Sequence, residues 1–245
     1  ATTFPNLFPF GEFHSVVAFP SFFLEVDGFS PKELRECLEA AFKTFELAMS
    51  TRPALRYWYL NWNHLPPAGA SIVHPHLQLL ATRNPTRMLS ELMRKSKQYY
   101  QRYKRNYWKE LVSVERKLDE RYIGSTGDIH WIASFAPTGN KEVLGVSEKW
   151  SSLREARASI SDICQGLRKI LKGYAKIGVK SFNLSSYSGP CDKKLPFFRL
   201  HFRLIARPDP VSLYTADRGF MEIFHHEPVI DTLPETLARE LRKVF

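Results

Sequence analysis

The hydrophobic positions early in the chain predict one amphipathic helix with clear start signals. Apolar residues recur every three or four positions over residues 34–49, as one buried helical face requires. Ser30 is a favourable N-cap, Pro31 suits the first helical position, and Glu33 completes a capping box. The helix is therefore expected to begin at Pro31 and to end near Ser50.

Strand-like patterns surround this helix, and the second half of the chain repeats the same order of elements. In the first half they cover residues 15–19, 55–63 and 72–81. In the second half, strand patterns at 131–135 and 143–146 precede a helical pattern at 153–177 and further strands at 182–187 and 198–206. A final helix is expected over residues 233–245.

The last strands of the two halves can be laid side by side, His74–Ala81 against Arg199–Ala206. This correspondence predicts an internal duplication of one α+β unit, with halves at residues 1–125 and 126–245. Because the strand signals within each half are consecutive, a largely antiparallel sheet is favoured over a doubly wound parallel one.

Composition places the chain among ordinary globular proteins. It has 245 residues, of which 44% are hydrophobic and 24% charged. No apolar run reaches the ~18 residues that a membrane span needs, and no signal peptide precedes the first strand. The three cysteines lie far apart, which argues against a disulfide framework. These observations lead us to expect a cytoplasmic protein with no membrane partner.

The net charge of +10 raises the question of nucleic acid. A basic stretch at residues 94–109 is interleaved with tyrosines and a tryptophan, as in surfaces that stack bases and pair with phosphates. The alternative is a connecting helix whose aromatic rings pack inward while its charges stay solvated. The helical spacing of Tyr99, Tyr103 and Tyr107 favours the connecting helix, so nucleic acid is not the expected partner.

The most informative segment combines small, amide and imidazole side chains. It contains Asn63, the turn residues Gly69, Ala70 and Ser71, and the sequence His74-Pro75-His76-Leu77-Gln78. Alternate residues of a strand share a face, so the two histidines and the glutamine should project together. Proline cannot donate a ladder hydrogen bond, so the strand should lie at an edge or begin near there.

These residue types fit phosphate chemistry. Backbone N–H groups at Gly69–Ser71 can hold an anion, to which the Ser71 hydroxyl adds a donor. Gln78 supplies an amide donor on the same face as the histidines. His76 can attack phosphorus as a neutral imidazole and carry a nucleotidyl group. Of the other histidines, His14, His64 and His130 are expected to be structural or surface residues.

The segment from Asn63 to Gln78 resembles the active-site segment of the galactose-1-phosphate uridylyltransferase branch of the histidine-triad superfamily. The resemblance implies two fused histidine-triad-like halves, a homodimer, and transfer of UMP or another nucleotidyl group between sugar 1-phosphates in galactose or related carbohydrate metabolism. His76 would be the nucleophile and Gln78 would stabilise charge on a phosphoryl oxygen. Asn63, Ser71 and the turn would bind the phosphates of a nucleotide sugar, and Phe220 would belong to the hexose-binding stretch.

The chain departs from that family at its metal ligands. The family's early Cys-x-x-Cys is absent, which leaves His74 alone of the zinc ligands. Glu91 and His201 match two iron ligands, but Arg203 occupies the place of another. We therefore expect no zinc, no iron and no required cofactor, with His74 orienting the site instead.

The hexose stretch also departs from the family, which leaves the substrate open. Gly219 and Glu222 stand where the family has a lysine and an apolar residue, and the family's uridine-binding arginines have no counterpart before Phe4. The sequence names neither sugar, base nor acceptor, and does not say whether a segment precedes Ala1. Two alternatives stay open: a phosphorylase that cleaves nucleotide sugars or dinucleoside polyphosphates, and a non-catalytic nucleotide- or RNA-binding protein.

Overall fold

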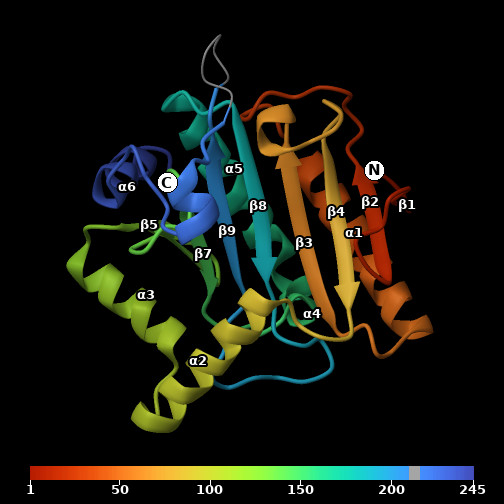
Figure 1. Cartoon of the computed structure of the whole chain (residues 1–245), viewed down its shortest axis with the longest axis horizontal. Helices are drawn as coiled ribbons and strands as arrows, with labels where there is room; N and C mark the ends of the chain where they lie inside the picture. The colour runs from red at the N-terminus through yellow and green to blue at the C-terminus, as the bar shows by residue number, and fades with distance from the viewer. Residues whose placement is uncertain (210–215) are drawn as a thin grey trace.

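A computed structural model describes residues 1–209 and 216–245, which form an α+β fold around one antiparallel sheet (Figure 1). The strands of the described chain are β1 (Thr2–Pro5), β2 (Phe13–Ala18), β3 (Tyr57–His64), β4 (His76–Thr82), β5 (Tyr122–Thr126), β6 (Ile129–Ala133), β7 (Val143–Ser147), β8 (Ser181–Tyr187) and β9 (His201–Arg207). Their order across the sheet is β1-β2-β4-β3-β8-β9-β7-β6-β5. Every neighbouring pair is antiparallel, so the expected fold class is confirmed.

Helices pack on both faces of the sheet, and on the second face they cover part of β3 as well as strands of the second half. They are α1 (Pro31–Thr51), α2 (Arg87–Tyr103), α3 (Tyr107–Leu118), α4 (Leu153–Ala156), α5 (Ile160–Lys176) and α6 (Pro234–Arg242), with short turns η1 (Pro66–Ala68), η2 (Arg157–Ser159) and η3 (Met221–His225). Figure 1 shows α1 and α5 behind the sheet, while α3 lies at one side and α2 at the lower end; α3 contacts β5 and β6. None of these helices is long and apolar enough to cross a membrane.

Two apolar clusters separate the two faces. The larger one joins α1 and α5 to the inward side chains of the strands, including Leu77 and Phe202. The smaller one lies on the opposite face, where Trp108 of α3 packs with residues such as Ile132 and Phe198. The first face therefore supplies the main core, and the second face is where the two halves differ.

The strand order shows how the duplicated units meet. β3 and β8 pair at the centre, flanked by β4 and β2 on one side and by β9 and β7 on the other. Gln78 pairs with Asn61 in the first unit, and Arg203 pairs with Ser185 in the second. Asn61 and Ser185 pair with each other across the centre. The division at residues 125/126 stays a prediction, and that boundary falls inside β5.

Several expected element boundaries were wrong, each for a local reason. The strand expected from residue 72 begins only at His76, because the residues before it form bends. The helix expected over 94–109 is two helices, since Lys104 adopts a left-handed conformation and Asn106 caps α3. The helix expected over 153–177 is broken by the 3₁₀ turn η2, and β1 and β5 were not expected.

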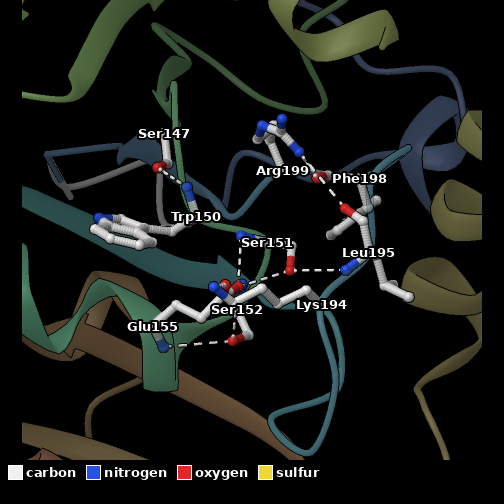
Figure 2. A network of polar contacts seen from close by, with 9 residues as sticks. All are labelled: Ser147, Trp150, Ser151, Ser152, Glu155, Lys194, Leu195, Phe198 and Arg199. Carbon is white, nitrogen blue, oxygen red and sulfur yellow. Dashed lines mark hydrogen bonds and ion pairs between the residues drawn. The ribbon is translucent and has the colours of Figure 1, made fainter.

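The loop between β8 and β9 is held in place by a polar network at the start of α4 (Figure 2). The Leu195 N–H donates to Ser151 Oγ at 3.1 Å, and Ser151 Oγ donates to a Glu155 carboxylate oxygen at 2.7 Å. Arg199 donates from Nε to the Glu148 carbonyl at 3.0 Å. This network fixes the loop where Phe198, fully buried, joins the smaller cluster.

Candidate active site

His76 is the first residue of β4, an internal strand between β2 and β3. Leu77 and Leu79 point into the main core, so His76 and Gln78 point to the opposite face. Pro75 directly precedes the strand, which confirms that the strand begins there rather than lying at an edge.

Backbone geometry fixes the tautomer of His76. Its Nδ1 lies 2.9 Å from the His74 carbonyl oxygen, and a carbonyl can only accept, so Nδ1 carries the proton. In the neutral ring the lone pair is therefore on Nε2. This atom has no hydrogen-bond partner in the described chain and is not among the buried unpaired polar atoms, so it is open to solvent. In this tautomer His76 can use Nε2 toward a ligand, although the residue is largely buried.

His74 supports this arrangement from the preceding bend. Its Nε2 lies 2.8 Å from the carbonyl oxygen of Phe19, to which it donates, and the Phe19 N–H donates to the Pro75 carbonyl at 3.0 Å. The segment before β4 is therefore fastened to the chain after β2. The orienting role of His74 in catalysis stays a prediction.

Gln78 is oriented by His14, a residue that the sequence analysis assigned to a structural or surface role. The Phe10 N–H donates to His14 Nδ1 at 3.2 Å, which leaves the proton on Nε2. That Nε2 lies 3.0 Å from Gln78 Oε1 and donates to it. The carbonyl oxygen of the Gln78 side chain is thereby occupied, and its NH₂ group, which has no partner among residues 1–209 and 216–245, can donate to a ligand.

The Gly69–Ser71 turn offers fewer anion donors than expected. The Gly69 N–H donates to the Pro66 carbonyl at 2.8 Å, and the Ala70 N–H donates to the Leu65 carbonyl at 3.3 Å. Gly69 has a φ of +83°, which suits glycine at this turn. Two of the three N–H groups are thus used inside the turn. The exposed Ser71, with its N–H and hydroxyl, is the donor that remains.

Asn63 is held by a chain of hydrogen bonds that comes from the second half. Asn183 Nδ2 donates to Asn63 Oδ1 and to the Ala68 carbonyl, each at 2.8 Å. Asn183 Oδ1 accepts from Arg207 Nη1 at 2.8 Å, and Arg207 forms a two-point ion pair with Asp217. This relay links Asn63 to the turn that precedes Ser71, and in the part of the chain that the structure describes the Asn63 NH₂ group has no partner.

Phe220 lies in the second half, on a cavity of about 750 Å³. The cavity is lined by residues of 138–140, 183, 205–207 and 216–231, and by none of the His-Pro-His segment. Asn183 and Arg207 of the relay belong to this lining, so the cavity connects to Asn63 through hydrogen bonds. The Phe220 side chain is 68% exposed.

Comparison with solved structures reveals close architectural relatives. An ADP-glucose phosphorylase from Arabidopsis thaliana, solved with bound ADP-glucose, matches 99% of this chain and 82% of its own at 20% identity and a TM-score of 0.82. A uridylyltransferase mutant matches 99% and 87% at 16% identity and a TM-score of 0.84. The chain therefore shares the fold of these two proteins.

Sequence comparison adds a relative without a known role. An uncharacterized protein from Archaeoglobus fulgidus is 29% identical over 247 residues, covering all of this chain and 73% of the relative. No family model matches the sequence. The resemblance stated from the His-Pro-His segment is thus confirmed at the level of the fold.

The metal sites of that family do not fit the residues present. Glu91 forms an ion pair with Arg94 on α2, and His74 uses its Nε2 on the Phe19 carbonyl. Over residues 1–209 and 216–245, no group of three or more His, Cys, Asp or Glu side chains is placed to hold a metal ion. Independence from metals and other cofactors stays a prediction.

The sequence analysis missed three residues that support the site: His14, Asn183 and Arg207. His14 could have been found from the pairing of its strand with β4, because it shares a face with Gln78. Asn183 and Arg207 lie more than a hundred residues from Asn63. Only the central pairing of β3 with β8 brings them together.

Proposed function

We propose that this protein is a nucleotidyltransferase that moves a nucleoside monophosphate group from a nucleotide sugar through a covalent intermediate on His76. The observation that carries the proposal is the His76 ring, which uses Nδ1 on the His74 carbonyl and so leaves Nε2 for a ligand. The fold shared with an ADP-glucose phosphorylase and a uridylyltransferase supports the same chemistry.

In the first half-reaction, His76 Nε2 attacks the α-phosphorus of the nucleotide sugar. The P–N bond forms as the bond from the α-phosphorus to the bridging oxygen breaks, and sugar 1-phosphate leaves with that electron pair. The ring then carries a positive charge, which the His74 carbonyl stabilises through Nδ1–H. In the second half-reaction, a phosphate oxygen of the acceptor attacks the same phosphorus, and the pair returns to Nε2.

The surrounding donors are suited to the charge that moves during this reaction. The free NH₂ group of Gln78 can donate to a non-bridging α-phosphoryl oxygen, where negative charge is redistributed in the transition state. The Asn63 NH₂ group and Ser71 supply further donors for the leaving phosphate. His14 orients the Gln78 amide and Asn183 orients the Asn63 amide before the substrate binds.

Mass spectrometry of the intact protein tests the covalent step directly. Wild type and His76→Ala are incubated with a panel of UDP-, ADP- and GDP-sugars without acceptor. The expected result is a nucleotidyl adduct on wild type alone, whose mass names the base. His201→Ala serves as the matched histidine control and should keep the adduct. An adduct on His76→Ala, or none on folded wild type with any donor, contradicts the proposal.

A phosphorylase is the second candidate, in which inorganic phosphate replaces sugar 1-phosphate as acceptor. The altered hexose stretch at the Phe220 cavity favours it, because Glu222 accepts from the Gly219 and Val229 N–H groups and so holds this stretch closed on itself. A phosphorylase needs no acceptor site for a hexose, so it tolerates the changes at Gly219 and Glu222 better than a sugar 1-phosphate transferase does. The two activities are distinguished by adding phosphate or a hexose 1-phosphate to the nucleotidyl adduct. Only the true acceptor should remove the nucleotidyl group from the protein rapidly.

A further inference from the structure

The basic, aromatic stretch between the halves does not pack inward as expected. Tyr103 and Tyr107 are 49% and 40% exposed, while only Trp108 among these rings is buried. With parts of α2, α3 and the second half of the sheet, they line a cavity of about 470 Å³. This volume is within the range of about 300–1,000 Å³ that is usual for small-molecule sites.

Aromatic rings form one wall of this cavity, which we call the tyrosine pocket. Tyr99 lies 4.7 Å from Tyr103 and 5.4 Å from Tyr107, measured between ring centroids. The Tyr99 hydroxyl donates to Glu110 at 2.9 Å, and the Trp108 indole N–H donates to Ser96 at 3.0 Å. These bonds hold two of the rings in place, and the apolar residues Leu92, Leu111 and Ile132 complete the floor. Such a wall suits the flat face of a nucleobase.

Cations form the rim of the same pocket. Lys95 and Arg102 both line it, and within the described chain no carboxylate lies within ion-pair distance of either. Arg102 lies 5.2 Å over the Tyr103 ring, which holds its guanidinium beside the aromatic wall. Arg203 reaches the pocket from the sheet with a buried Nε that has no partner. A ligand that joins a planar ring to an anion would satisfy both features.

The position of the tyrosine pocket within the duplicated fold also supports a phosphate-containing ligand. Arg203 occupies on β9 the place that Gln78 occupies on β4. Arg203 pairs with Leu144 of β7, as Gln78 pairs with Val16 of β2. The tyrosine pocket therefore opens on the sheet position that corresponds to the candidate phosphate-binding amide of the first half.

We propose that the tyrosine pocket is a second ligand site, separate from His76, that binds a nucleoside monophosphate. The base stacks on one of the Tyr99 and Tyr103 rings and meets the other at its edge, since the two rings are inclined by 47°, and the phosphate lies between Lys95 and Arg102. The site performs no chemistry, because His201, the histidine of this half, is stacked 4.0 Å from Trp108 and fully buried. This inference does not depend on the proposed function.

Binding is measured by equilibrium dialysis with AMP and UMP in a His76→Ala/Asn63→Ala background, which disables the first site. One nucleotide per chain is expected to bind. Lys95→Ala/Arg102→Ala should weaken AMP binding about tenfold or more, since each phosphate contact is charge-assisted. Arg87→Ala/Lys97→Ala removes the same charge from α2 outside the pocket and should leave the affinity unchanged. Tyr103→Ala should weaken both AMP and adenosine.

Three results would overturn the inference. The first is absence of AMP and UMP binding in the folded background variant. The second is equal weakening by both double-alanine variants, which would indicate a general electrostatic attraction. The third is binding of a uridylate decamer about a hundredfold tighter than AMP with strong salt dependence, which would identify the surface as a nucleic-acid site.

Discussion

His76 and His201 occupy corresponding places in the two halves, and their contrast explains where the chemistry can occur. Each donates from Nδ1 to the carbonyl two residues earlier, at 2.9 and 3.0 Å respectively. The Nε2 of His76 is open, whereas that of His201 is buried without a partner. Trp108 and Tyr187 stack on the His201 ring. The duplicated backbone therefore prepares two imidazoles alike, and the covering helices decide which one can meet a substrate.

Burial also affects the charge that the His201 ring can carry. It lowers the pKa of His201 to about 3, with a smaller contribution from the nearby Arg203 charge and an opposing one from the Arg199 carbonyl. His201 is thus a neutral core residue at all ordinary pH values. The comparison makes specific predictions for activity on one side and for stability on the other.

The largest expected effect is that alanine at His76 abolishes activity, whereas alanine at His201 lowers stability. His76→Ala should reduce nucleotidyl transfer at least about a thousandfold, because it removes the nucleophile. His201→Ala should keep transfer but lower the free energy of unfolding by about 2–4 kcal/mol, since it leaves a cavity between two rings. Initial rates and urea unfolding of both variants check this. Loss of transfer in a folded His201→Ala protein would contradict the division of roles.

The second comparison concerns Gln78 and Arg203, which occupy corresponding places. Arg203 donates to the fully buried Glu142 at 2.6 Å, so Arg203→Gln would leave a buried carboxylate unpaired. We expect a loss of about 3 kcal/mol in unfolding free energy. Gln78→Met, at a partly exposed position, should cost less than about 1 kcal/mol. Similar losses for the two variants in chemical denaturation would refute a structural role specific to Arg203.

The features that could be predicted from the sequence are those that depend on residues close together along the chain. The capping box of Ser30 and Glu33 and the apolar face behind it are local signals, and α1 begins and ends within one residue of expectation. The duplication, and His76 with Gln78 on one face, were also visible, because strand periodicity is local.

The sealing of His201 was not predictable, because it depends on α2 and α3 folding back over β9. The break at Lys104 and the cap at Asn106 create that hairpin. The tyrosines keep helical spacing across this break, so the sequence pattern predicts one continuous helix instead of the hairpin. In the same way, the relay to Asn63 depends on a pairing between β3 and β8 across 120 residues.

The third prediction tests whether the second half contributes to the first half's site. Asn183→Asp removes the NH₂ group that donates to Asn63 and Ala68, while Arg207 can still pair with the new carboxylate. We expect kcat/KM to fall about tenfold through loss of one to two oriented hydrogen bonds, with little change in thermal midpoint. Asn84→Asp, the same change on an exposed loop, is the control. Unchanged kinetics of Asn183→Asp would mean that Asn63 does not need the relay.

The fourth prediction uses the lowered histidine pKa values. Burial lowers the pKa of His64 to about 4 and that of His201 to about 3. Below about pH 6.5 the unfolded chain binds protons that the folded chain does not, so stability should fall as pH decreases. Each histidine contributes a slope of at most about 1.4 kcal/mol per pH unit. His201→Phe should flatten the decline between pH 6 and pH 4 in urea titrations, and an unaltered slope would contradict the assignment.

The smallest expected effect concerns His14, which contacts Gln78 from the position that Glu142, the ion-pair partner of Arg203, occupies in the second half. Without its donor, the Gln78 side chain can rotate and present its oxygen to the phosphoryl group, where two oxygens repel. His14→Ala should therefore lower kcat about threefold to tenfold, the value of one oriented hydrogen bond. His14→Gln, whose amide can still donate to Gln78 Oε1, should recover part of this loss. If both variants lose kcat equally while unfolding normally, His14 acts only by filling space, and Gln78 must be oriented by the substrate itself.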